Sequence, residues 1–223
     1  MTRNYLDANP TQMTLVPALT LGFVLGMRHA TDADHIAAIG TIVAGGRSAR
    51  RAGLVGAAWG VGHSASVLLV GGTLVLLRLP MPTRVAMALE FGAALMIVGL
   101  GVRSLITQAP REIASHVRPL VVGVVHGLAG SAVLALLVIG TSSTAVAAGV
   151  YLVCFCAGTI AGMALITALL AVPAHLQPSW ALTLDRGVRV VAGVASVAIG
   201  LAMAHRLGVR DGLFGAAPTW TPE

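Results

Sequence analysis

Apolar residues form six long runs along the chain, and short polar joints separate them. The runs cover roughly residues 14–46, 52–77, 85–102, 119–140, 145–172 and 187–205. A helix needs about 20 mainly apolar residues to cross a bilayer, and Gly45, Pro80 and Pro110 mark joints where a helix would end. The pattern predicts an all-α polytopic membrane protein with about six transmembrane helices. We expect one domain over residues 1–223.

The composition favours a membrane chain over a soluble one. Only 10% of the residues are charged and 57% are hydrophobic, whereas soluble domains carry about 25% charged residues. The formal net charge is +6, but the arginines are spread between apolar runs, so we expect a lipid bilayer as partner and no nucleic acid. The first long apolar run exceeds a signal-peptide core, so we expect no cleaved signal.

The distribution of arginines predicts the orientation in the membrane. With the N-terminus outside, eight arginines lie in inside loops, namely Arg47, Arg50, Arg51, Arg103, Arg111, Arg118, Arg186 and Arg189. Five lie in outside segments, namely Arg3, Arg78, Arg84, Arg206 and Arg210. Because inside loops carry the excess of positive charge, we expect a multi-pass protein of the plasma (bacterial inner) membrane with both termini outside.

Short motifs recur between the two halves of the chain at similar spacing. Gly26-Met27-Arg28-His29 is followed 97 residues later by Gly123-Val124-Val125-His126, Gly62-His63-Ser64 is followed 96 residues later by Gly158-Thr159-Ile160, and Val98-Gly99-Leu100 has a weaker echo 101 residues later at Ile199-Gly200-Leu201. Three helices per half place the second half in the opposite orientation. The spacing predicts an inverted three-plus-three repeat, with halves of about 14–105 and 119–206 and a site between them.

Five ionisable residues interrupt the middle of the first apolar run, namely Arg28, His29, Asp32, Asp34 and His35. An ionisable group near the bilayer centre costs about 2.5–3.5 kcal/mol, so we interpret the segment as functional. A polar loop between two short helices would leave flanks of about 14 and 11 residues, which are too short to span. A re-entrant break buried in protein stays open.

The spacing leaves two explanations for Asp34. On a regular helix of about 100° per residue, His29, Asp32 and His35 fall within an arc of about 120°, and Asp34 points away from it. Either Asp34 has a second role, such as pairing with Arg28 or orienting an imidazole, or the helix is unwound here. Arg28 can also reach Asp32, four residues further on.

Further polar residues lie at similar depth in other predicted helices. A lone histidine there is usually a hydrogen-bond partner between helices, but histidines converging from three helices favour a ligand role. Imidazole and carboxylate donors without a thiolate suit Ni²⁺, Co²⁺, Zn²⁺ or Cu²⁺. We therefore expect metal ligands at His29, Asp32, Asp34, His35, His63 and His126, with supporting or coupling roles for Arg28, Ser64, Glu90, Ser131 and Thr159.

These motifs resemble the nickel/cobalt transporter (NiCoT) family. The match is His29-x4-Asp34-His35 together with Gly62-His63-Ser64, whereas the segments 126–131 and 158–163 look like the shorter, roughly six-helix relatives grouped with urease accessory membrane proteins. The chain departs from the family where Gly40-Thr41 stand in place of its usual Asp-Asn. The resemblance implies that His29, Asp34 and His35 recognise the metal, with support from His63.

The sequence therefore predicts a secondary transporter that takes up Ni²⁺ or Co²⁺ through a His/Asp site within the membrane. It carries no Gly-x4-Gly-Lys-Ser/Thr motif for nucleotide-driven pumping and no His-Glu-x2-His pair of a metalloenzyme, so we expect no enzyme, no catalytic residues and no permanently bound cofactor. An exporter of the same metals and a non-transporting accessory protein linked to nickel-enzyme maturation remain alternatives.

Overall fold

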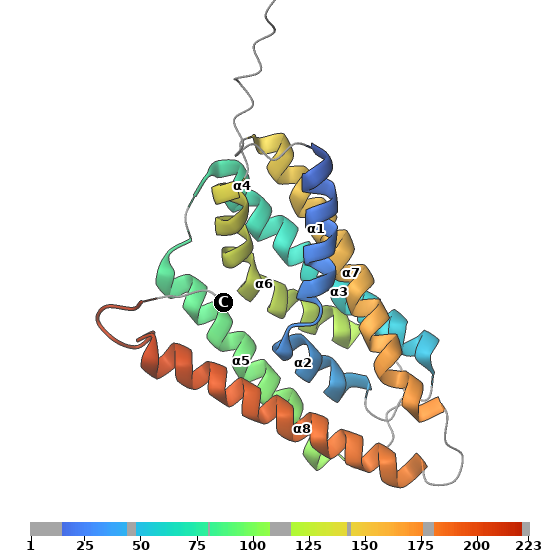
Figure 1. The fold of residues 1–223 in the computed structure, drawn as a ribbon. Coiled ribbons are helices and arrows are strands. Elements are labelled where there is room, and N and C mark those ends of the chain that lie inside the picture. Colours follow the sequence, from blue (N-terminus) through green and yellow to red (C-terminus); the bar gives the residue numbers. More distant parts are fainter. Residues whose placement is uncertain are drawn as a thin grey trace, which may run out of the picture.

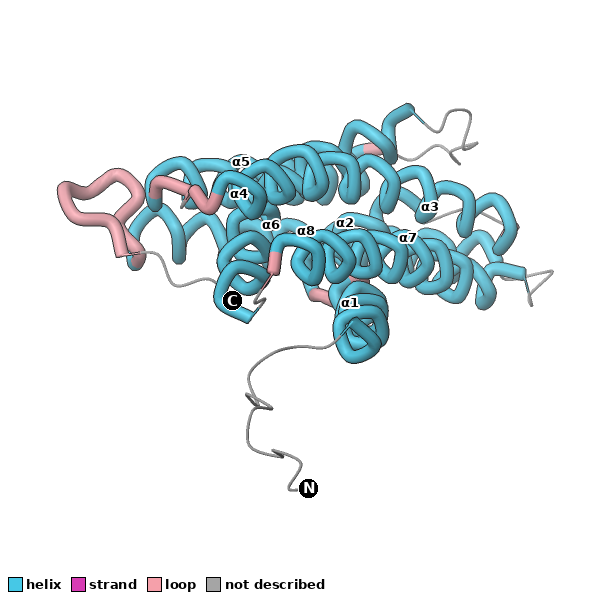
Figure 2. Tube along the Cα trace, turned by 90° about the horizontal axis from the view of Figure 1, so that it is seen from above, coloured by secondary structure: helices cyan, strands magenta, loops and turns pink. Residues whose placement is uncertain are grey.

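A computed structural model describes residues 15–43, 48–79, 81–107, 117–141, 144–175 and 181–219, and these ranges are helical apart from short loops (Figure 2). The helices are α1 (Leu15–His29), α2 (Ala33–Val43), α3 (Ala49–Ser66), α4 (Gly72–Leu77), α5 (Thr83–Ile106), α6 (Val117–Thr141), α7 (Ala145–His175) and α8 (Ala181–His205). A π-helical turn, Val67–Gly71, joins α3 and α4 into one helix, and another, Arg206–Arg210, extends α8. The all-α prediction is confirmed.

The lengths of the helices and the side chains on their surfaces are those of an integral membrane protein. Four described helices are long and apolar enough to cross a bilayer, namely Ala49–Leu77, Thr83–Ile106, Val146–Val172 and Arg186–Arg210. Large apolar side chains such as Leu69, Leu76 and Val191 are exposed on them, as expected of helices that face lipid. The sequence-based number of six spans exceeds these four and stays a prediction.

The first apolar run forms two helices instead of one. α1 ends at His29 and α2 begins at Ala33, after a short break, and α2 runs in a different direction from α1 (Figure 1). This corrects the exclusion of a loop between two short helices. The length argument fails because neither helix has to span the membrane alone: α1 packs against α7, and α2 packs against α5 and α8.

The remaining helices pack in a few large pairwise contacts. α3 lies against both α6 and α7, and α5 lies beside α8 along one edge of the molecule (Figure 1). One buried apolar cluster includes Val67, Tyr151 and Phe155, and a second includes Trp59 and Met163. The break between α1 and α2 lies next to both clusters, because Ala30 belongs to the second and the partly buried Leu25 packs against the first.

Glycines bring two helix pairs into backbone contact. Where α1 crosses α7, a Cβ atom at Gly26 would overlap the carbonyl oxygen of Phe155, and one at Gly158 would overlap that of Phe23. Where α3 crosses α6, a Cβ at Gly123 would overlap the carbonyl oxygen of Trp59. Small residues that let backbones approach are a known basis of helix association in membranes. Here they bring α6 against α3 one turn before His63 and His126.

Replacing Gly123 by alanine is expected to destabilise the protein, because the added methyl group must displace the α3 backbone. Overpacking of this kind costs about 1–3 kcal/mol. The matched control is Gly99→Ala in α5, where an added Cβ would have nothing within 4 Å, so only the gain in helix propensity of up to about 1 kcal/mol applies. Thermal unfolding in detergent measures both variants, and equal midpoints would contradict the close crossing.

Candidate metal centre

The break between α1 and α2 forms because the last turn of α1 tightens. The backbone N–H of Thr31 donates to Arg28 over 2.8 Å and that of Asp32 donates to His29 over 3.1 Å, so i to i+3 bonds replace the helical pattern. The carbonyl of Asp32 then accepts from the backbone N–H of Ile36, and this i to i+4 bond belongs to the first turn of α2. Asp34 lies in the first turn of α2, where the helix dipole favours a negative charge.

Four imidazoles meet at this break, and they come from four helices. His29 ends α1, His35 belongs to α2, His63 to α3 and His126 to α6. The ring centroid of His35 lies 4.5 Å from that of His29, 5.3 Å from that of His63 and 4.4 Å from that of His126. The structure thus brings together all four histidines that the sequence singles out, with His35 at the centre.

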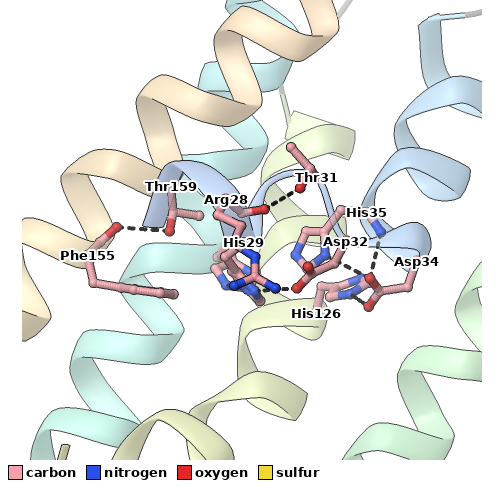
Figure 3. A network of polar contacts seen from close by, with 10 residues as sticks. Arg28, His29, Thr31, Asp32, Asp34, His35, His126, Phe155 and Thr159 are labelled. Carbon is pink, nitrogen blue, oxygen red and sulfur yellow. Dashed lines mark hydrogen bonds and ion pairs between the residues drawn. The ribbon is translucent and has the colours of Figure 1, made fainter. Parts of the chain in front are cut away.

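The two aspartates hydrogen-bond to three of these imidazoles. Asp34 lies 2.9 Å from Nδ1 of His35 and 2.8 Å from Nε2 of His126, and Asp32 lies 2.7 Å from Nδ1 of His29 (Figure 3). Asp34 therefore orients imidazoles, and the helix is also unwound, so both explanations offered for its position apply. Within the described ranges, no ion pair of 4 Å or less joins Arg28 to either aspartate.

The carboxylates determine which imidazole nitrogens are free to bind a ligand. An ionised carboxylate only accepts hydrogen bonds, so Nδ1 of His35 and Nε2 of His126 donate to Asp34. The lone pairs then lie on Nε2 of His35 and Nδ1 of His126. Both of these atoms are buried and have no hydrogen-bond partner among the described residues. Buried polar atoms of this kind are normally paired, so these two lone pairs are available to a ligand.

The nitrogens fall into two groups that could hold an ion. Donor atoms of His29, His35 and His63 lie within 4.8 Å of one another, and so do those of Asp34, His35 and His126. In the first group Nε2 of His29 and Nε2 of His63 are 3.3 Å apart. The two rings share a hydrogen bond at this distance. Two nitrogens bound tetrahedrally to one ion at about 2.0–2.1 Å are about 3.3–3.4 Å apart, so the same spacing also suits two ligands of one metal.

Two aromatic side chains that the sequence analysis did not consider enclose the imidazoles. The indole of Trp59 stacks on His35, with centroids 5.5 Å apart, and the ring of Phe155 lies 5.3 Å from His29. Trp59 precedes His63 by four residues, so helical spacing alone places both on one face of α3. That spacing was the available signal. No sequence signal marked Phe155, because its contact with His29 depends on how α7 crosses α1.

The hydroxyls of the predicted supporting residues donate to backbone carbonyls of the helices. The hydroxyl of Ser64 donates to the Cys156 carbonyl over 3.3 Å, and that of Thr159 donates to Phe155 of its own helix over 2.9 Å. Ser131 donates to Gly127 over 2.6 Å. Glu90, on α5, belongs to neither of the two donor groups. Supporting roles for these residues and for Arg28 stay predictions, as does metal binding by the cluster itself.

Comparison with known proteins gives one informative match. The chain is 32% identical over 222 residues to the urease accessory protein UreH of Bacillus sp. (strain TB-90). The alignment covers 91% of this chain and 97% of that protein, so it includes both the break and the helices around it. No protein-family model matches the chain, and no solved structure matches it.

Replacing Asp34 by asparagine is expected to weaken Co²⁺ binding by about tenfold to a hundredfold, the usual effect of losing a carboxylate that orients metal-binding histidines. His35 and His126 donate to different oxygens of Asp34, and asparagine replaces one of these oxygens with an NH₂ group, which donates and cannot accept. Asp32→Asn is the comparison, and its effect should be smaller because the Asp32 side chain is 50% exposed and water can replace it. Calorimetry on purified protein measures both, and equal losses would argue against the central position of Asp34.

Proposed function

The chain belongs to the family of the urease accessory protein UreH, and from this membership we propose that it is a permease that carries Ni²⁺, or Co²⁺, into the cell across the plasma membrane. The relative's name connects it with urease, a nickel enzyme, so supply of nickel for enzyme maturation is the role we favour. At a finer level we assign the chain to the short, six-helix branch of the NiCoT family.

The observation that carries this proposal is the buried histidine cluster within apolar helices. His35, His63 and His126 are at most 4% exposed, and two carboxylates border them. Neutral imidazole with carboxylate is a donor set for borderline divalent ions, whereas Ca²⁺ and Mg²⁺ prefer oxygen ligands alone. A cluster of this kind in an apolar helical protein is expensive to bury, which supports a cargo site better than a structural role.

The membrane potential supplies enough energy for uptake without nucleotide hydrolysis. One elementary charge that crosses 100 mV gains about 2.3 kcal/mol, so a divalent ion that moves inward gains about 4.6 kcal/mol. That corresponds to a concentration ratio of more than a thousandfold. A secondary transporter is therefore sufficient for a trace metal.

The glycine contacts support an inverted repeat with halves of about 14–105 and 119–206, within one domain. Gly26 contacts Phe155 at the α1–α7 crossing, and 97 residues after Gly26, Gly123 contacts Trp59 at the α6–α3 crossing. Trp59 in turn precedes Phe155 by 96 residues. This contact thus recurs with α6 in place of α1 and α3 in place of α7, as a two-fold relation between halves requires.

The pair α5 and α8 supports the same relation, but the residues that correspond differ from those that the sequence motifs paired. A Cβ at Gly101 in α5 would lie 2.7 Å from the Gly193 carbonyl, and one at Gly200 in α8 would lie 2.8 Å from the Ala94 carbonyl. Gly101 and Gly200 are 99 residues apart, as are Ala94 and Gly193. Gly99, which the sequence echo paired with Gly200, would have nothing within 4 Å of a Cβ.

Purified protein in liposomes is expected to accumulate radioactive Ni²⁺ when the interior is made negative, and His35→Ala should reduce the initial rate at least tenfold, because His35 belongs to both donor groups. The matched control is His205→Ala, at an exposed position at the end of α8, which should transport normally. Co²⁺ should compete with Ni²⁺, and Mg²⁺ should not.

Wild-type liposomes without metal flux would overturn the permease and leave the accessory role. Cells separate uptake from export: deletion of an importer lowers urease activity in nickel-poor medium, whereas deletion of an exporter sensitises cells to added nickel. Increased sensitivity with unchanged urease activity would reverse the proposed direction.

We also place both termini outside, on the arginine distribution. Alkaline phosphatase, which is active only after export, should therefore be active when fused to the C-terminus. A fusion at Arg103, within a predicted inside loop, should be inactive. The opposite pattern would invert the orientation without affecting the metal site.

A further inference from the structure

The two donor groups of the cluster overlap in a single residue. His29 and His63 belong only to the first group, Asp34 and His126 belong only to the second, and His35 belongs to both. The rings of His63 and His126 are 6.1 Å apart, further than either is from His35. We treat the groups as two neighbouring positions, because the donor atoms of His63 and His126 do not fall in one group.

The hydrogen bonds of His35 make the two positions alternatives. A neutral imidazole has one lone pair. While Nδ1 of His35 donates to Asp34, Nε2 is free for the first position. In the second position the ion takes the place of the two hydrogen atoms between Asp34 and the facing nitrogens, Nδ1 of His35 and Nε2 of His126. Each imidazole then carries its proton on its other nitrogen, which is Nε2 in His35 and Nδ1 in His126. One imidazole cannot do both, and the cluster holds one ion at a time.

Each position has its own partly exposed ligand. The His29 side chain is 21% exposed and so is that of Asp34, whereas His35 between them is 3% exposed. Figure 3 shows His29 on the side of Phe155 and Thr159 of α7, and Asp34 with His126 on the other side. Each position therefore has one ligand that is not fully buried.

His29 and His126 hold matching places in the two halves of the chain. Each lies three residues after a glycine whose Cβ would overlap the backbone of the neighbouring helix, Gly26 in one case and Gly123 in the other. The first position thus has His29 from the first half of the chain, and the second position has His126 from the second half. These matching places fit two positions that are used in turn.

From these observations we propose that the ion occupies two alternating positions, His29–His35–His63 and Asp34–His35–His126, and passes from one to the other as His35 exchanges its binding nitrogen. Movement of the ion between the positions during transport rests on the proposed permease function, but the existence of the two positions does not. The first position offers imidazoles alone, and the second adds a carboxylate oxygen.

The test uses Co²⁺ as the probe on purified full-length protein and combines X-ray absorption with equilibrium dialysis. His126→Ala removes a ligand of the second position alone and should bind one Co²⁺ through nitrogen donors. His63→Ala removes a ligand of the first position alone and should bind one Co²⁺ through the imidazoles of His35 and His126 and an oxygen of Asp34. Wild-type protein should bind one ion per chain. Both variants should transport at least tenfold more slowly in liposomes, because each retains only one position.

Two bound ions per wild-type chain, or the same ligand set in both variants, would overturn the alternating positions. So would transport at the wild-type rate by either variant. His63→Gln and His126→Gln replace any alanine variant that fails to elute as a monodisperse species. Absence of flux in the wild type would remove the permease function only, since the ligand sets are read from binding.

Discussion

The carboxylate of Asp34 is the interaction on which the centre depends. It accepts from imidazoles of α2 and α6 and from the backbone N–H of His35, so it links the start of one helix to the middle of another. It can do so only because the chain breaks after His29, since a continuous helix would turn Asp34 away from the other side chains. The break places Asp34, and the orientation of two imidazoles and the location of their free lone pairs then follow from this one residue.

Close helix crossings supply the second requirement. Imidazoles from four helices can meet only if the backbones approach within the length of a side chain, and Gly26, Gly123 and Gly158 allow this at two crossings. Trp59 and Phe155 then fill the space around the rings. Nε2 of His35 and Nδ1 of His126 are buried beside these rings, so an ion bound here would exchange water ligands for protein donors. The same packing makes the cluster costly when it is empty, because the lone pairs have no other partner.

Most of this arrangement could be read from the sequence, and what could not be read depends on tertiary contacts. Apolar runs predicted the helices, and the cost of charge in an apolar run identified His29, Asp34 and His35. A loop between two short helices was excluded on spanning length, and that exclusion was wrong because spanning length says nothing about helices that pack on protein. Arg28 was expected beside an aspartate from helical spacing, but the break removes that spacing, and Asp32 pairs with His29 instead. The contact of Phe155 depends on a crossing between segments more than a hundred residues apart, which no local pattern encodes.

The charges around the cluster suit a divalent ion. Asp32 and Asp34 contribute two negative charges, the imidazoles must be neutral to coordinate, and Arg28 is exposed and makes no ion pair with either aspartate in the described chain. A divalent cation brings the formal charge to zero, which lowers the cost of holding the group among apolar helices. A monovalent ion would leave net charge behind and gains less from imidazole donors. For the proposed metal site, charge balance would therefore favour a divalent ion, and the imidazoles would favour transition metals over Ca²⁺ and Mg²⁺.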